Sequence, residues 1–297
     1  MNRTRANFLM LLVAIIWGLA FVAQVSGMEH IHAFALNMHR NFVAGCFLLG
    51  IFLFFPNIRH VGTDLRATIV GGICCGIALS VAMALQQYGL QFTTAGKGSF
   101  ITALYIILVP IGGTVLGHKV PKKMWVSVII ACVGLYFISV KKDTGFSVNT
   151  GDALVFLSAV GFAVHILVVD HFSANVDGVA MSCIQFFVAG IMSFFYVLPT
   201  GASLFGDYVG ALPSILYLGF LSSGVGFTLQ IIAQRYSEPT TVSLLMSSES
   251  IFGLLGGIFI LGELITSREW IGCALMFIAI LLAQLPLPKF LRKSEEQ

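Results

Sequence analysis

The feature that most constrains this chain is one long stretch that occurs twice. Residues 91–140 and residues 236–285 align without a gap at an offset of 145, and each copy places a polar turn before an apolar helix that carries hydroxyl groups. In each copy there follow a Leu-Gly pair, a short charged link, a tryptophan (Trp125 or Trp270) and a second apolar helix. The offset also holds outside this window, whereas chance similarity between apolar stretches would drift. We therefore interpret the chain as two duplicated halves, residues 1–145 and residues 146–297.

The composition places these halves in a lipid bilayer. Hydrophobic residues make up 58% of the chain, charged residues only 10%, and the mean hydropathy is +0.95. A soluble domain carries roughly 25% charged residues, and its core cannot absorb this much apolar sequence. The apolar runs are long and continuous, which favours helices, because a helix satisfies its own backbone hydrogen bonds inside the bilayer.

We therefore predict an all-α polytopic membrane protein with ten transmembrane helices. The ten apolar segments cover residues 6–26, 33–54, 67–88, 95–116, 124–140, 151–170, 178–198, 211–233, 240–262 and 269–286. Each half has five segments, an odd number, so the second half enters the membrane upside down relative to the first. The predicted architecture is two inverted five-helix repeats, which is typical of secondary transporters with a substrate site between the halves.

The loop charges predict that both termini lie in the cytoplasm, with the protein in the cell (inner) membrane. One side of the membrane receives eleven Lys and Arg residues: Arg3, Arg5, Arg59, Arg66, Lys119, Lys122, Lys123, Arg235, Lys289, Arg292 and Lys293. The other side receives four: Lys97, Lys141, Lys142 and Arg268. Cytoplasmic loops carry the excess of Lys and Arg. The first segment resembles a secretory signal, but it is long and aligns with the sixth segment, which argues against cleavage.

Equivalent faces of the fourth and ninth segments carry small or hydroxylated residues. At helical spacing these are Gly98, Thr102, Tyr105 and Val109 in the fourth segment, and Ser243, Ser247 and Ser250 in the ninth. Polar groups that face lipid are costly, so this face is expected to meet protein or a wet cavity. One interpretation is a substrate path built from both helices. The alternative is tight helix packing through small residues and Ser/Thr hydrogen bonds.

Two charged residues fall inside apolar segments. Glu249 lies deep in the ninth segment, where a carboxylate must be protonated or paired. It is a candidate for proton coupling or for binding a substrate amine, and a structural pair is the alternative. On the helical wheel it lies beside the hydroxyl face, so contact with a neighbouring helix is an option. Arg40, in the second segment, could pair with Glu249, hold a substrate carboxylate, or extend its charge to the interface.

Several weaker candidates complete the expected site. Trp17 and Gln24 share a face of the first segment, and amide side chains end the third and eighth segments at Gln86, Gln87, Gln230 and Gln234. Such amides can bind a polar solute or cap helix ends. His39 and His165 are lone histidines, more often packed than functional. Pro110 is expected to kink or weaken the fourth helix, because proline removes a backbone hydrogen bond.

Signals for catalysis, metals and cofactors do not occur in the sequence. It has no HExxH, Walker or GxSxG motif, which argues against a hydrolase and an ATP-driven pump. The six cysteines lie within apolar runs without CxxC spacing, so we expect neither a metal site nor disulfides. We predict no cofactor, and the net charge of +3 gives no indication of nucleic-acid binding.

The duplicated motifs resemble those of a known family. Residues 99–110, SFITALYIILVP, followed by Leu116-Gly117, resemble the first-half signature of EamA-type transporters in the drug/metabolite transporter superfamily. The run Ser248-Glu249-Ser250-Ile251-Phe252, followed by Leu261-Gly262-Glu263, resembles the second-half signature. The resemblance implies two inverted five-helix halves, a central cavity, export of small metabolites, often amino acids, and family glutamates at Glu249 and Glu263. Two positions depart from it, His118 opposite Glu263 and Ser250 where many members have proline.

These observations favour a secondary transporter that exports small metabolites such as amino acids by alternating access. Its expected partners are a small-molecule substrate and the lipid bilayer. The expected substrate-binding residues are Thr102, Tyr105, Ser243, Ser247, Ser250, Glu249, Arg40, Trp17, Gln24 and Gln87. The alternatives are an integral membrane enzyme or lipid-handling protein, for which no catalytic motif is found, and a structural or sensory membrane protein.

Overall fold

The computed structural model describes residues 3–55, 63–117, 122–139, 149–174, 176–237 and 239–284, and within these ranges the chain is helical without a strand. The first half forms α1 (Arg3–Met28), α2 (Ala33–Phe54), α3 (Leu65–Gly89), α4 (Ala95–Thr102), α5 (Tyr105–Val115) and α6 (Lys122–Ser139). The second half forms α7 (Thr150–Ser173), α8 (Gly178–Val197), η2 (Leu198–Thr200), α9 (Tyr208–Leu216), η3 (Tyr217–Phe227), α10 (Thr228–Gln234), α11 (Pro239–Met246), α12 (Glu249–Leu261) and α13 (Ser267–Gln284).

Seven stretches of the described chain are long and apolar enough to cross a bilayer. They are Arg3–Met28, Ala33–Phe54, Leu65–Gly89, Ala95–Val115, Thr150–Ser173, Gly178–Thr200 and Tyr208–Gln234. Three shorter apolar helices join them, Trp125–Gly134, Glu249–Leu261 and Trp270–Ala279. A helix needs about 20 apolar residues to span the hydrocarbon core. The chain is therefore a multi-pass helical membrane protein. The charges used to predict its orientation lie partly outside the described residues, namely Arg59, Lys119, Lys141, Lys142, Lys289, Arg292 and Lys293.

Short polar side chains fix where several helices begin. The Asp64 carboxylate accepts the backbone N–H of Arg66 at 2.8 Å at the start of α3. Asp177 accepts the N–H groups of Val179 and Ala180 at 3.0 and 2.9 Å at the start of α8. The first N–H groups of a helix have no acceptor within the helix. These carboxylates accept their hydrogen bonds in place of water.

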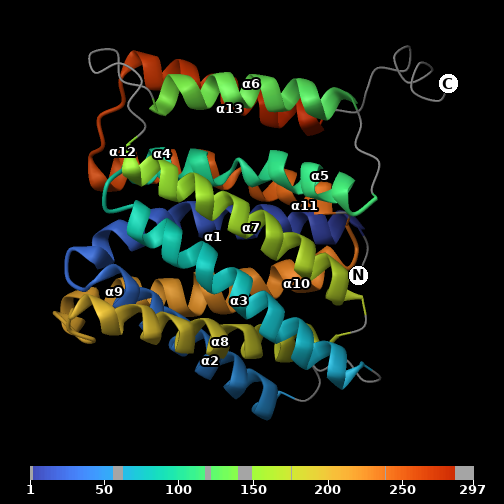
Figure 1. Ribbon diagram of the computed structural model, residues 1–297, viewed down its shortest axis with the longest axis vertical. Coiled ribbons are helices and arrows are strands. Elements are labelled where there is room, and N and C mark those ends of the chain that lie inside the picture. The colour runs from blue at the N-terminus through green and yellow to red at the C-terminus, as the bar shows by residue number, and fades with distance from the viewer. Residues whose placement is uncertain are drawn as a thin grey trace.

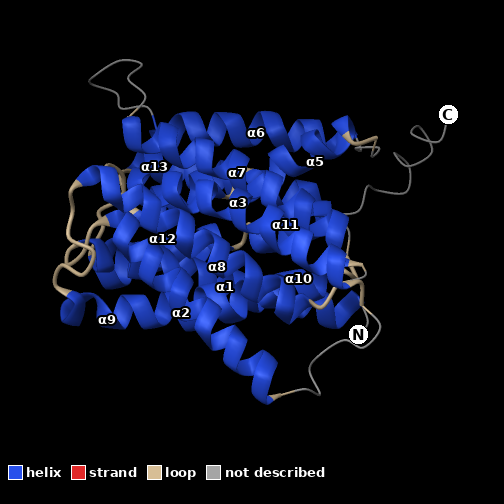
Figure 2. Cartoon of the chain, turned by 60° about the horizontal axis from the view of Figure 1, so that its bottom comes forward, coloured by secondary structure: helices blue, strands red, loops and turns tan. Residues whose placement is uncertain are grey.

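Helices of one half pack on helices of the other throughout the bundle (Figure 1). α2 packs on α8, α4 on α12, and α6 on α13, which form a pair at one edge of the bundle in both ribbon views (Figure 2). α3 packs on α7 and α8, and the equivalent span of the second half, α9–η3–α10, packs on α1 and α2. Each contact between the halves therefore has a counterpart when the halves are exchanged.

The predicted fourth and ninth helices are each broken in two. α4 ends at Thr102 before α5, and α11 ends at Met246 before α12. At the breaks, backbone N–H groups donate to the carbonyl three residues earlier instead of four. The Ile106 N–H donates to the Ala103 C=O at 3.0 Å, and 145 residues later the Ile251 N–H donates to the Ser248 C=O at 3.1 Å. Such tighter turns interrupt the regular helix and change the direction of the side chains that follow.

Pro110, which we expected to kink or weaken the fourth helix, does not coincide with the break. It lies inside α5, after the interruption at residues 103–104. The second half breaks at the equivalent place although Leu255 occupies the position of Pro110. The interruption therefore depends on features that both halves share, not on the missing N–H of one proline.

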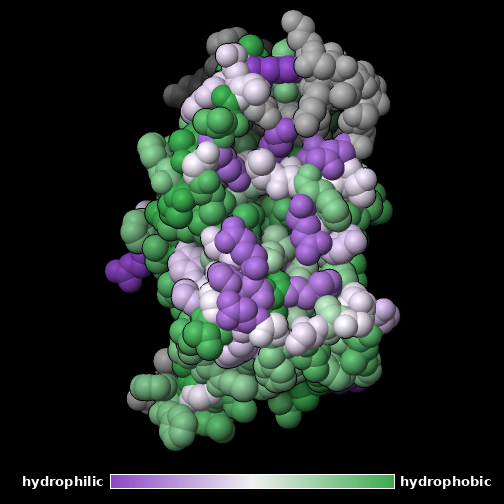
Figure 3. Space-filling model, turned by 90° about the vertical axis from the view of Figure 1, so that its left-hand side faces the viewer, coloured by the Kyte–Doolittle hydropathy of each residue, from purple (hydrophilic) through white to green (hydrophobic). Residues whose placement is uncertain are grey.

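One end of the bundle, where α1 ends and α4 begins, has a polar surface. Figure 3 shows hydrophilic side chains gathered at this end, with hydrophobic side chains on the flanks. Large apolar side chains are exposed along the helices, among them Phe54, Ile129 and Phe259. This distribution is that of a helical bundle whose sides contact lipid and whose ends contact water.

Candidate functional site

A small cavity lies between the two halves of the chain. The first half lines it with residues of α1, α2, α3, α4 and α5, and the second half with residues of α7, η3, α10, α11 and α12. Small-molecule sites typically have a few polar groups in a mostly apolar wall. The position of this cavity between the halves and the composition of its wall match such a site.

Both helix breaks face this cavity. Thr102 and Tyr105 line it from the two sides of the first break, and Met246 and Glu249 line it from the two sides of the second. Interrupted helices place helix ends inside the membrane, where their N–H and C=O groups and dipoles can act on a bound solute. The breaks therefore position the polar part of the site.

Glu249 is the first residue of α12, and 3% of its surface is exposed. Its side chain interacts with the hydroxyl of Tyr105, and both residues line the cavity. The first turn of a helix favours a negative charge. The wheel of an uninterrupted helix placed Glu249 beside the functional face, but the break turns it into the cavity.

Arg40 is buried in α2 and donates to two hydroxyl groups of the second half. Its Nε donates to Ser223 Oγ at 3.2 Å and its Nη2 to Ser222 Oγ at 3.1 Å. Both serines belong to η3, a π-helix, which is a local widening often found at functional sites. The Trp17 indole N–H donates to the Ser222 carbonyl at 2.9 Å, so one segment positions both Arg40 and Trp17.

The structure argues against two of the three options for Arg40. It does not extend to the interface, because 3% of its surface is exposed. It is not bridged to Glu249 either: although both line the cavity, no ion pair joins them in the described structure. The protein thus holds one cationic and one acidic side chain in the same buried space, apart from each other.

Three glutamines contribute amide groups to the cavity wall. Gln24, Gln86 and Gln230 line it, and the side-chain carbonyl oxygens of Gln24 and Gln230 have no partner among the described residues. Gln86 donates to Thr102 Oγ1 at 3.0 Å. His165 also lines the cavity, and its Nε2 bonds Gln185 Oε1 at 3.1 Å. Gln86, Gln230 and His165 were only weak candidates from sequence, because a lone amide or imidazole is as often structural.

The remaining expected residues lie outside the cavity wall. Ser243, Ser247, Ser250 and Gln87 are fully buried but do not line it. The Ser250 hydroxyl donates to the Ser247 carbonyl at 2.8 Å, and the Gln87 amide to the Gln24 carbonyl at 3.4 Å. The serines were placed by a wheel for one continuous helix, and the break moves Met246 and Glu249 to the cavity instead. The two halves therefore contribute chemically different residues.

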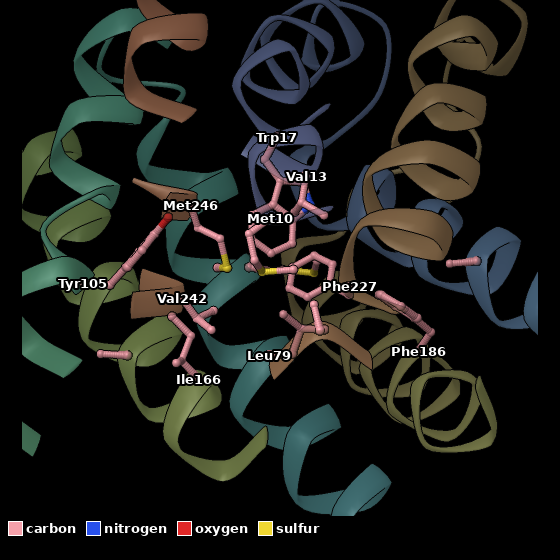
Figure 4. Close-up of a cluster of buried hydrophobic side chains, with 14 of the residues drawn as sticks. Met10, Val13, Trp17, Leu79, Tyr105, Ile166, Phe186, Phe227, Val242 and Met246 are labelled. Atoms are coloured by element: carbon pink, nitrogen blue, oxygen red, sulfur yellow. The ribbon is translucent and has the colours of Figure 1, made fainter. Parts of the chain in front are cut away.

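The rest of the wall is apolar and aromatic. The rings of Trp17 and Phe227 lie 4.4 Å apart between centroids. Figure 4 shows Tyr105 and Met246 on the side of α5 and α11, with Trp17 and Phe227 opposite them. No sequence signal separates such residues from ordinary core residues, because cavity wall and core use the same side chains.

Comparisons with known proteins agree with this architecture. The model of the EamA-like transporter family matches residues 4–140 and again residues 149–285. An uncharacterized transporter of Archaeoglobus fulgidus is 29% identical over 285 residues, 96% of this chain and 87% of that protein. Solute carrier family 35 member B1 of Rattus norvegicus is 24% identical over 220 residues, covering 69% of this chain and 68% of that protein.

A solved crystal structure of a protein matches this fold over 100% of both chains, with a TM-score of 0.71 at 15% sequence identity. At that identity the match supports the fold alone. The relatives named above are transporters or solute carriers, which agrees with the absence of an enzyme motif from the sequence. Since the family model matches the chain twice and covers most of its length, this multi-pass membrane protein is a member of the EamA-like transporter family.

Proposed function

We propose that this protein is a secondary transporter that exports small metabolites such as amino acids by alternating access. The observation that carries the proposal is that one basic and one acidic side chain, Arg40 and Glu249, are buried in the same cavity between the two halves. An uncompensated charge in a low-dielectric interior is costly. A ligand with a carboxylate and an ammonium group compensates both charges and leaves its apolar part to the aromatic wall.

The two halves act in this proposal as inverted five-helix repeats of residues 1–145 and 146–297, which gives ten membrane-spanning segments. The exchangeable contacts, such as α2 on α8 and α4 on α12, support this arrangement. Rocking one repeat against the other moves the opening of the cavity from one side to the other. The excess of Lys and Arg in the loops of one side supports a location in the cell (inner) membrane with both termini in the cytoplasm.

Competitive efflux tests the proposal. Cells with and without the protein are loaded with a mixed pool of amino acids and related metabolites, and the medium is profiled over time. We expect selective release of one chemical class. We expect Thr102→Trp to abolish this release, because the larger side chain would occupy the cavity that Thr102 lines. Val133→Trp, on an exposed site of α6, is the matched control and should retain release. Release that is unaffected by Thr102→Trp would show that substrates do not pass through this cavity.

A further inference from the structure

The unpartnered polar atoms in the cavity wall are unevenly distributed between acceptors and donors. Gln24 Oε1 and Gln230 Oε1 are buried acceptors without partners in the described structure. The Glu249 carboxyl group interacts with the Tyr105 hydroxyl, and its two oxygens can accept further hydrogen bonds. All four residues line the cavity. Buried polar atoms are nearly always paired, so an excess of free acceptors indicates the group that fills the space.

The side-chain oxygens of Gln24 and Gln230 lack donors, although hydrogen bonds form at neighbouring atoms of the same residues. Gln230 Nε2 donates to Gln234 Oε1 at 3.4 Å, whereas Gln230 Oε1 accepts no hydrogen bond from the described residues. The Gln24 backbone carbonyl is used by Gln87 Nε2, while the Gln24 side-chain oxygen stays free. The wall therefore presents acceptors from α1, α10 and α12 to the same cavity.

The basic side chain in the cavity, Arg40, already has hydrogen-bond partners within the protein. Arg40 has hydroxyl partners for Nε and Nη2 on the neighbouring η3, and none of its nitrogens is among the unpartnered buried atoms. A ligand carboxylate would bind an arginine that already donates hydrogen bonds to Ser222 and Ser223. A ligand ammonium would meet the Glu249 carboxyl group and two amide oxygens, those of Gln24 and Gln230, which have no other partner among the described residues.

We infer that the obligatory recognition group of the substrate is a protonated primary amine held by Glu249, Tyr105, Gln24 and Gln230, and that a substrate carboxylate is dispensable. An ammonium group has three N–H donors and no acceptor, which is the complement of this wall. The protein accordingly takes amines with an apolar body as well as amino acids, and it rejects carboxylic acids that lack the amine. This inference rests on the proposed function, because it names the chemistry that the transport cavity selects.

Matched ligands test this without any change to the protein. The purified full-length protein is titrated by calorimetry with phenylalanine, 2-phenylethylamine, 3-phenylpropionate and N-acetylphenylalanine, and with the corresponding leucine series. We expect binding of the amino acid and the amine and at least about 10-fold weaker binding of both compounds without a free amine. Binding of the carboxylic acid as tight as that of the amine overturns the inference but leaves a transporter of organic acids.

Two variants separate the ammonium site from general damage. Tyr105→Phe removes one hydroxyl and Glu249→Gln removes the charge at nearly constant shape, and we expect each to weaken binding of 2-phenylethylamine by about 10-fold or more. Glu29→Gln, an exposed acid outside the cavity, should leave it unchanged. Because the ligand series uses the unmodified protein, misfolding of a variant leaves the test intact. Absence of binding by every compound in the series, with efflux intact, also contradicts the inference, whereas absence of efflux contradicts the proposed function.

Discussion

The carboxylate of Glu263, just after α12, caps the first turn of α4 in the other half: its Oε1 accepts the Ala95 N–H at 2.6 Å and its Oε2 the Gly96 N–H at 3.0 Å. Gly262 adopts φ 67°, a left-handed conformation, and the Glu263 N–H donates to the Gly257 carbonyl at 3.0 Å, which turns the chain toward α4. A carboxylate is favoured at a helix N-terminus because unpaired N–H groups and the positive end of the dipole meet there. The contact joins the broken helices of the two halves.

Removal of this carboxylate should destabilise the protein. Glu263→Ala leaves two N–H groups of α4 without their acceptor, so we expect the free energy of unfolding to fall by about 1 kcal/mol or more. Denaturant unfolding in detergent micelles, followed by tryptophan fluorescence, measures the change. Glu29→Gln is the control acid, since it is exposed. Equal stability of Glu263→Ala and wild type would mean that water replaces the carboxylate without cost.

The glycine beside Glu263 provides a second, independent change. A Cβ at Gly257 would overlap Glu263 Oε2, so Gly257→Ala should displace the carboxylate from α4. We expect this variant to be destabilised, and the double variant with Glu263→Ala to lose less than the sum of the single losses, because both changes break one interaction. The control is Gly50→Ala in α2, where a Cβ meets nothing within 4 Å. It should stabilise the protein by about 0.5–1 kcal/mol through helix propensity.

The hydroxyl partners of Arg40 should matter more than other buried serines. Ser223→Ala removes the acceptor of Arg40 Nε and leaves a buried charged donor unpaired, at an expected cost of about 1–3 kcal/mol in unfolding free energy. Ser158→Ala is the matched control, because that hydroxyl only donates to the Val155 carbonyl of its own helix. Thermal unfolding of both variants gives the comparison. A larger loss in Ser158→Ala than in Ser223→Ala would contradict the role assigned to Ser223.

At the polar end of the bundle, Asp207 Oδ2 lies 2.8 Å from His30 Nδ1. The Gly210 backbone N–H, and next the His30 ring, lower the pKa of the Asp207 carboxyl below its ordinary value of 3.8. A lowered folded-state pKa stabilises the protein above the pKa of the unfolded chain, and this contribution is lost as the pH falls through the folded-state pKa.

Asp207→Asn should therefore be less stable than wild type at pH 6, and the difference should shrink as the pH falls below about 4. Asparagine keeps an oxygen that can cap α9, so the comparison isolates the charge. Thermal unfolding of both proteins between pH 3 and pH 7 measures the difference. A difference that stays constant over this range would show that the carboxylate charge contributes nothing.

The sequence alone predicted the class of protein and the positions of its helices. Long apolar runs require helices in a bilayer wherever they pack, and the duplication at one offset fixed which helices correspond. The sequence also singled out Arg40, Glu249 and Trp17, because a charged or amphipathic side chain in an apolar run is costly in any fold. All three line the cavity.

Only the tertiary structure decided which side of each broken helix meets the cavity. The broken helices contact each other across the halves, for example through the Ser99 hydroxyl, which donates to the Ser250 carbonyl at 3.2 Å. Such contacts have no signature in local sequence. A wheel for a continuous helix therefore chose Ser247 and Ser250, whereas the interrupted helix presents Met246 and Glu249. Hydropathy is a property of a segment and can be read along the chain. The direction of a side chain after a break depends on the backbone hydrogen bonds at the break, which hydropathy does not reveal.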